Sequence, residues 1–403
     1  MPSCLGYAPV TSAALPGRFV VFTASFPFPR SAGSVEYVTN IFGAFPPSSV
    51  IFHAPASSEA VGFDAVYPQQ IVRHPYIIHV VDGYRASRLQ RVKQYVYWPL
   101  AALRIVLHRR FDMVYLGEYN PAGIGVLIAA LLGRTSYVLL TYAEEVTYVQ
   151  KRPVHAWLFR TLARRATRVI TVSEYTRTLL QGLGVCPAKI CKILPPIPTA
   201  KRVKNPDTSL HLREQIGLGT MPLLLTVGRL IERKGHTTVI EALPKIRRHF
   251  PDVRYAIVGN GPMQERLEEL AERIAPGAVM FFHGLGDQDV ATLYDSCTVF
   301  VMPHRTIPET GDTEGCPTVF LEASLHGKPV IGGNAGGVAD AIIDGETGLI
   351  IDGTDVDAVA DAIIRLLSDV AFANTLGVHG QAYATGLTPV HAAECLLTAS
   401  GVV

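Results

Sequence analysis

The sequence lacks the features of a disulfide-rich, zinc-binding or secreted protein. No two cysteines form a CxxC pair, which argues against structural zinc and against a redox motif. Residues 1–17 lack a basic start followed by a long apolar core, so we expect no signal peptide. These absences predict a reduced, cytoplasmic protein. The six cysteines are scattered along the chain: Cys4, Cys186, Cys191, Cys297, Cys316 and Cys395.

Charge and long apolar runs are also scarce. Charged residues make up 17% of the 403 residues, and the net charge of +2 is too small to suggest nucleic acid as a partner. The most apolar run, residues 122–132, is too short to span a bilayer and is followed by Arg134. Hydrophobic residues nevertheless make up 48% of the chain, enough for the cores of two or three domains.

Buried strands alternate with helices in both halves of the sequence. The first half gives strands at 18–26, 111–117 and 135–143, and the second restarts at 223–227. This alternation indicates parallel, doubly wound sheets. Prolines 195, 196 and 198 and a polar stretch separate the halves. We therefore expect a loose segment at 1–17, a first domain at 18–198, a linker at 199–220, a second domain at 221–378 and a tail at 379–403.

One stretch, ETGDTEGCPTVFLEASLHGKPVIGGNAGG at 309–337, combines an anion site with acidic side chains. Pro317 suits the first helical position, and Gly327 ends the helix. The backbone N–H groups near 315–319 have no partner within the helix and suit an anion. Glu314 and Glu322 would repel a phosphate but accept hydrogen bonds from sugar hydroxyls. A nucleotide sugar offers both kinds of group.

A second stretch places two cations beside a glycine. The strand 223–227 is followed by Gly228 and Arg229, and Lys234 comes shortly before the next helix. An arginine fork and a lysine charge beside bare backbone suit a diphosphate. The segment GNGPMQ at 259–264 lacks the third glycine of a dinucleotide fingerprint, so NAD is disfavoured.

Two glutamates separated by seven residues, in the context EGCPTVFLEA…GKPVIGG, resemble the motif of the retaining glycosyltransferases of family 4. The resemblance is more specific over 223–352 than over the first 200 residues. It implies the GT-B fold, with two Rossmann-like domains facing a cleft and a tail that returns to the first domain. It also implies transfer of a hexose from GDP-mannose or a UDP-hexose to a glycan, lipid or small-molecule hydroxyl, without a metal or another cofactor.

The resemblance also assigns roles to residues. Glu314 would lie by the donor sugar and Glu322 would bind the ribose. Arg229 and Lys234 would bind the diphosphate, and Leu285 would lie near the nucleobase. The other residues expected to bind the donor are Gly33, Gly228, Gly315, Cys316, Pro317, Thr318 and Val319.

The first half departs from the family pattern at TYAEE, residues 141–145. Tyr142 stands where the family has a histidine beside the donor sugar, and Glu145 keeps the acid. Tyr142 can donate a hydrogen bond to a sugar hydroxyl but cannot carry positive charge. At GSVE, Ser34 replaces the second glycine of the family's Gly-Gly-x-Glu. We expect Tyr142 to take part in the chemistry, and a non-catalytic nucleotide-sugar-binding partner protein remains an alternative.

A helix expected at 85–110 carries basic residues beside aromatic ones, and Pro99 should break or kink it. Such a helix can lie on an anionic membrane, or it can be a domain helix with a solvated basic face. Peripheral contact with the inner face of a membrane is therefore compatible with the sequence. A membrane-surface adaptor and another GT-B enzyme, such as a nucleotide-sugar epimerase, remain further alternatives.

Overall fold

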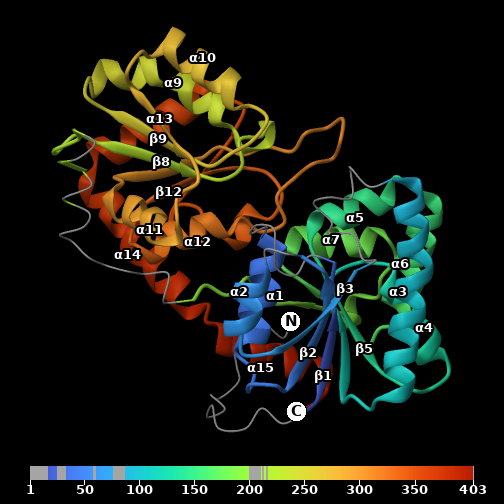
Figure 1. Cartoon of the computed structure of the whole chain (residues 1–403). Coiled ribbons are helices and arrows are strands. Elements are labelled where there is room, and N and C mark those ends of the chain that lie inside the picture. The colour runs from blue at the N-terminus through green and yellow to red at the C-terminus, as the bar shows by residue number, and fades with distance from the viewer. Residues whose placement is uncertain are drawn as a thin grey trace. The chain divides into compact units, whose positions relative to one another are not determined.

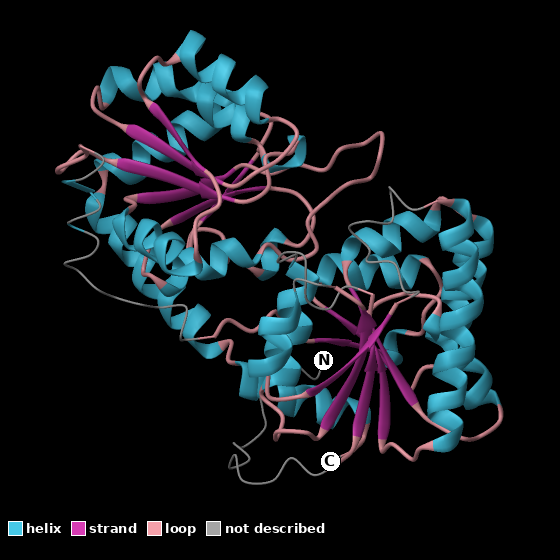
Figure 2. Cartoon of the chain, in the orientation of Figure 1, coloured by secondary structure: helices cyan, strands magenta, loops and turns pink. Residues whose placement is uncertain are grey.

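The computed structural model describes residues 17–24, 33–57, 60–75, 87–198, 210, 213–214 and 217–402. The chain forms two compact units, one of Met1–Pro196 with Pro389–Val403 and the other of Ile197–Thr388. Each unit has a parallel sheet with helices on both faces (Figures 1 and 2), which confirms the predicted doubly wound architecture. The start of the helix expected at 85–110 and residues 1–16 lie outside the described residues.

The first sheet has the strand order β3-β2-β1-β4-β5-β6-β7, with every neighbouring pair parallel. The central strands are buried along their whole length, as parallel strands covered on both faces should be. The strand order reverses between β1 and β4, which makes this pair the switch point of the sheet. The strands are β1 (Phe19–Phe22), β2 (Val50–Pro55), β3 (Gln70–His74), β4 (Met113–Leu116), β5 (Tyr137–Thr141), β6 (Arg168–Thr171) and β7 (Ile190–Lys192).

Helices α3, α4 and α6 cover one face of this sheet, and α1 and α15 cover the other (Figure 1). Helix α15 comes from the end of the chain, and its Ser400 hydroxyl lies 3.1 Å from that of Tyr115 in β4. The helices of this unit are α1 (Gly33–Gly43), α2 (Val61–Val66), α3 (Arg88–His108), α4 (Ala122–Leu131), α5 (Ala143–Gln150), α6 (Pro153–Arg165), α7 (Glu174–Gly182) and α15 (Pro389–Ser400).

Of the break or kink expected at Pro99, the break does not occur, because helix α3 continues through this residue. It begins with a capping box between Ser87 and Gln90. Proline removes one N–H, and packing against a neighbouring helix offsets that loss. Helix α4 supplies this packing, because a Cβ on its Gly125 would lie 2.0 Å from the carbonyl oxygen of Pro99. In the described part of the chain, no helix is long and apolar enough to cross a membrane.

The second sheet has the order β10-β9-β8-β11-β12-β13, again all parallel. Helices α9, α10 and α13 pack on one face, α11 and α12 pack on the other, and α14 contributes to the clusters of both faces. The strands are β8 (Leu223–Val227), β9 (Arg254–Val258), β10 (Val279–Phe282), β11 (Val299–Met302), β12 (Val330–Gly333) and β13 (Leu349–Ile351). The helices are α9 (His236–His249), α10 (Gln264–Ile274), α11 (Asp287–Ser296), α12 (Thr318–Leu325), α13 (Val356–Ser368) and α14 (Val370–Gly386).

Candidate active site

Helix α12 begins one residue later than the sequence suggests. Pro317 precedes it with an extended backbone, so it is the N-cap residue and Thr318 is the first helical residue. The N–H groups of Thr318 and Val319 lie in the first turn, where they have no partner within the helix. Gly315 and Cys316 lie directly before this end and are half-buried. The helix end expected from the sequence is therefore present, shifted by one residue.

The carboxylate of Glu314 joins two cationic side chains of the β8–α9 connection. Its Oε1 atom lies 2.9 Å from Nζ of Lys234 and 2.8 Å from Nε of Arg233. Arg233 also forms an ion pair with Asp312. Glu314, Lys234 and Arg233 are all buried. The structure therefore brings two of the predicted site residues, Lys234 and Glu314, into direct contact.

These charges decide the ionisation of Glu314. Burial alone would raise the pKa of its carboxyl group, but the charges of Lys234, Arg233 and His304 outweigh burial and hold the pKa well below its ordinary value. His304 is fully buried, with its Nε2 atom 3.0 Å from the carbonyl oxygen of Ala335. Glu314 is therefore a carboxylate that accepts hydrogen bonds.

Glycines explain how the Glu314 loop is held. A Cβ on Gly336 would lie 2.1 Å from the carbonyl oxygen of Glu314, and one on Gly333 would lie 1.9 Å from that of His304. The N–H of Gly337 donates a 3.0 Å hydrogen bond to the Glu314 carbonyl. The glycine-rich end of β12 therefore lets two backbone segments approach closely.

The other predicted diphosphate residues follow β8. Gly228 has a φ of +158°, and a Cβ there would lie 3.4 Å from Cε of Lys234. Arg229 is exposed, whereas Lys234 is buried at the end of a short 3₁₀ helix (Glu232–Lys234). Gly235 then adopts the left-handed conformation, with a φ of +75°, before α9. The two cations of this motif thus lie in different environments.

Glu322 lies on α12 and is half-buried. The hydroxyl of Tyr294, from α11, donates a 3.0 Å hydrogen bond to its Oε2 atom. The Tyr294 ring stacks on His326, whose Nδ1 atom lies 2.7 Å from Asp295. Leu285, expected near the nucleobase, follows β10 and packs against the core cluster that contains Tyr294.

The predicted residues of the first unit lie at the carboxyl ends of its strands. Tyr142 follows β5, and its hydroxyl donates to the carbonyl oxygens of Gly117, at 3.0 Å, and Ser34, at 3.5 Å. Its ring lies edge-on to that of Tyr37. Gly33 begins α1, and no heavy atom lies within 4 Å of a Cβ built there. Tyr142 therefore contacts the first turn of α1, which begins at Gly33.

Comparison with known proteins identifies the family. Residues 20–201 match the model described as Glycosyltransferase Family 4, and residues 210–382 match that of glycosyl transferases group 1. A GDP-mannose-dependent α-(1-6)-phosphatidylinositol monomannoside mannosyltransferase of Mycolicibacterium smegmatis is 32% identical over 371 residues, or 91% of this chain and 93% of the relative. The chain belongs to glycosyltransferase family 4.

Other similar proteins agree with this family. The mannosyltransferase of the same description from Mycobacterium tuberculosis is 31% identical over 376 residues, with 91% of this chain and 94% of the relative covered. Among solved structures, Anabaena Alr3699/HepE in complex with UDP matches with a TM-score of 0.77 at 18% identity, covering 96% of this chain and all of that one. Sucrose-phosphate synthase of Thermosynechococcus elongatus matches with a TM-score of 0.75 at 19% identity, covering 96% and 99%. These structures show the fold, and the glycosyltransferase has the predicted GT-B architecture.

Several contacts of the glycosyltransferase were not predicted from its sequence. Arg233 and Tyr294 each bond a predicted glutamate, but neither was singled out. The ERK run before Gly235 was a visible signal for Arg233, since it places a second cation beside Lys234. For Tyr294 the only signal was its position on an amphipathic helix, which does not reveal the partner of its hydroxyl.

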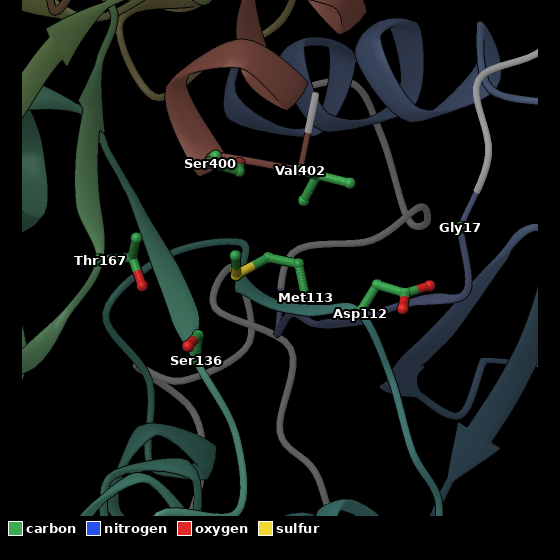
Figure 3. Close-up of a pocket in the computed structure, with 8 residues that line it drawn as sticks. Gly17, Asp112, Met113, Ser136, Thr167, Ser400 and Val402 are labelled. Atoms are coloured by element: carbon green, nitrogen blue, oxygen red, sulfur yellow. The ribbon is translucent and has the colours of Figure 1, made fainter.

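A cavity of about 660 Å³ in the first unit lies away from these residues. It is lined at the amino ends of β4, β5 and β6 by Asp112, Ser136 and Thr167, with Ser400 of α15 above them (Figure 3). Tyr142 and Gly117 lie at the opposite, carboxyl ends of the same strands. The candidate site of the glycosyltransferase does not include this cavity. Among the described residues, no group of three or more His, Cys, Asp or Glu side chains could hold a metal ion.

Proposed function

We propose that this glycosyltransferase moves a hexose from a nucleotide diphosphate sugar to an acceptor hydroxyl, with retention at the anomeric carbon. The observation that carries the proposal is the 2.9 Å contact between Lys234 and Glu314, beside the first turn of α12. In such a donor the sugar is bonded directly to a phosphate. The cation Lys234 suits the phosphate, and the carboxylate Glu314 beside it suits the sugar hydroxyls.

The chemistry follows from the charges. Departure of the diphosphate builds negative charge, which Arg229, Lys234 and the N–H groups at Thr318 would stabilise. Glu314, as a carboxylate, would orient the sugar, and Glu322 would hold the ribose. We propose that these fixed cations act without a metal ion. The acceptor attacks from the face that the diphosphate leaves, and the leaving phosphate takes the acceptor's proton.

We favour GDP-mannose over a UDP-hexose as the donor. Four relatives that share 27–32% identity over 91% of this chain are all described as GDP-mannose-dependent mannosyltransferases. Their described acceptors are phosphatidylinositol mannosides, so a lipid-linked mannoside is the acceptor class that we propose. The UDP-bound structural neighbours are too distant to decide the donor.

A lipid acceptor agrees with the surface of the first unit. Residues 88–165 contain twelve Arg and Lys but only four Asp and Glu. Large apolar side chains are exposed among them on three neighbouring helices, α3, α4 and α6 (Figure 1). Basic and apolar groups together suit the interface of an anionic membrane. The most exposed of these apolar residues are Leu89, Val92, Val96 and Leu100 on α3, Leu131 on α4, and Val154 and Trp157 on α6.

The donor can be tested without knowing the acceptor. We would measure thermal stability with GDP, UDP and ADP, for the native protein and for Glu322→Ala. A ligand at one hundred times its dissociation constant stabilises a protein by about 2.7 kcal/mol. We expect GDP to raise the Tm of the native protein and to lose this effect in the variant. No response to any nucleotide would contradict the donor-site assignment.

Transfer itself needs a second assay. GDP-mannose would be incubated with phosphatidylinositol monomannoside in anionic vesicles, and the anomeric configuration of the product determined by NMR. We expect an α-linked product and co-sedimentation with the vesicles that weakens at high salt. Nucleotide binding with neither transfer nor donor hydrolysis would instead support the non-catalytic partner protein. An altered donor without any acceptor would support an epimerase.

A further inference from the structure

Glu118 is a buried carboxyl group for which the proposed chemistry has no use. It follows β4 with one glycine between them, and only 7% of its surface is exposed. Its strand neighbours β1 at the point where the order of the first sheet reverses. Open parallel sheets bind ligands at the carboxyl ends of the strands at such a point. Glu118 therefore lies where a sheet of this kind usually binds its ligand.

The carboxyl group of Glu118 ties the end of β1 to the end of β4. Its Oε2 atom accepts a 2.8 Å hydrogen bond from the hydroxyl of Thr23. Its Oε1 atom accepts bonds from the N–H of Ala24, at 2.5 Å, and the amide of Asn120, at 3.2 Å. All three partners can donate, and a carboxylate is the form that can accept from all of them. Among the described residues, no cation contacts the group.

A second tie starts from the adjacent residue. The carbonyl oxygen of Gly117 accepts a hydrogen bond from the hydroxyl of Tyr142. The same hydroxyl also donates to the carbonyl oxygen of Ser34 in the first turn of α1. A Cβ on Gly117 would lie 2.9 Å from that of Thr23, so this residue fits closely against the end of β1. Gly117 and Glu118 together therefore connect the ends of β1, β4 and β5 with the start of α1.

Burial without a nearby cation makes the ionised form of Glu118 unfavourable. Burial, opposed only by neutral hydrogen bonds, raises the pKa of Glu118 to about 7 from its ordinary 4.5. The titratable groups that face it are Tyr142, Glu145 and, across the Tyr142 ring, Tyr37. Burial also raises the pKa of Glu145, to about 8. None of these groups supplies a positive charge, so the acid lowers stability when it ionises.

We propose that ionised Glu118 is a positioning residue of the transfer reaction, which holds the end of β1 in place for the donor and, through the adjacent Gly117 and Tyr142, the first turn of α1. A neutral side chain of the same shape would be more stable at this position near pH 8. A carboxyl group that destabilises the fold when ionised, and that lies at the carboxyl ends of the strands where ligands bind, is typical of a functional site. This inference rests on the proposed function, because the donor-binding role of Gly33 at the start of α1 belongs to it.

Glu118→Gln tests the proposal, since glutamine copies the neutral form and does not titrate. The carboxyl group of Glu118 has a higher pKa in the folded protein than in the unfolded chain, so protonation of Glu118 stabilises the folded state. This stabilisation is lost as the pH rises from 4.5 through 7. We therefore expect the Tm of the variant, relative to the native protein, to rise from pH 5 to pH 8. Glu269→Gln, an exposed acid on α10, serves as the matched control and should show no such trend.

Transfer activity supplies the second measurement. At pH 8 we expect kcat/KM of Glu118→Gln to fall on the order of tenfold, the scale of a lost hydrogen bond to a charged group. The native protein should fall toward the same level as the pH drops below 7, and Glu118→Asp, which keeps a carboxylate, should retain this pH dependence. Native activity in Glu118→Gln at every pH would overturn the positioning role. A Tm difference that does not change with pH would overturn the ionisation. Because the Tm measurement needs no activity, failure of the proposed function is distinguishable from both.

Discussion

The hydroxyl group of Tyr294 donates a 3.0 Å hydrogen bond to Oε2 of Glu322, the glutamate proposed to hold the donor ribose. Tyr294 is almost fully buried, and its ring is fixed by stacking on His326, at a centroid distance of 5.5 Å. His326 is in turn held by Asp295 on α11. One oxygen of Glu322 is therefore fixed by a rigid aromatic side chain before any donor binds.

Tyr294→Phe should weaken nucleotide binding through this contact. We expect the dissociation constant for GDP to rise about tenfold, since a hydrogen bond to a charged group is lost. Binding of 2′,3′-dideoxy-GDP should change little, because that ligand lacks the ribose hydroxyls. Calorimetric titration of both ligands measures the difference. Tyr383→Phe is the matched control, as it removes a hydroxyl bonded to the carbonyl of Asp340 in the same unit. Equal weakening for both ligands would contradict a role at the ribose.

Alanine variants of Arg229 and Lys234 should both lower kcat but should differ in their effect on the Tm. Loss of either cation should cost roughly 3 kcal/mol of transition-state stabilisation, or about a hundredfold in kcat. Arg229 is exposed, so Arg229→Ala should leave the Tm almost unchanged. Lys234→Ala also leaves buried Glu314 with one cation fewer, so it should lower the Tm as well. Steady-state kinetics and thermal unfolding check both effects. Near-normal turnover of Arg229→Ala would refute its diphosphate role.

Glu314 should make stability depend on pH in the opposite sense to Glu118. Its folded pKa is held well below the ordinary 4.5, so its contribution is fully present above that value and is lost as the pH falls through the folded pKa. Glu314→Gln leaves two buried cations under-compensated and should cost about 3 kcal/mol at pH 7. This difference should shrink below pH 4.5. Urea unfolding at pH 7 and pH 4, with exposed Glu346→Gln as the control, measures it. A difference that grows on acidification would contradict the assigned ionisation.

The fold could be predicted from local patterns, because hydrophobic periodicity and the Gly and Pro residues that end helices and strands are local properties of the sequence. The strand expected at 223–227 is β8, and the helix of the paired glutamates begins within one residue of its expected start. The contacts between side chains could not be predicted in this way. Arg233 meets Glu314 across 81 residues of sequence, and Glu118 meets Thr23 across 95. Residue type alone does not say which of two neighbouring cations, Arg229 or Lys234, becomes buried.

Pro99 also shows that local sequence patterns do not reveal tertiary contacts. Proline was expected to break or kink the segment, because it removes an N–H and crowds the preceding turn. Helix α3 continues without a break, and Gly125 of α4 packs against the Pro99 carbonyl. This packing partner lies outside the segment, so a local pattern cannot reveal it.

Gly336 offers a test of how the Glu314 loop is held. Both Gly336 and Gly345 have a positive φ, of +55° and +73°, so alanine at either should cost about 1 kcal/mol in backbone strain. A Cβ at Gly345 meets no heavy atom within 4 Å, whereas one at Gly336 would lie 2.1 Å from the Glu314 carbonyl oxygen. Gly336→Ala must therefore also displace the loop that carries Glu314. We expect Gly345→Ala to lower the Tm slightly and to keep native kcat/KM, and Gly336→Ala to lower both. If the two variants were equally active, the position of Glu314 would not depend on this close backbone approach.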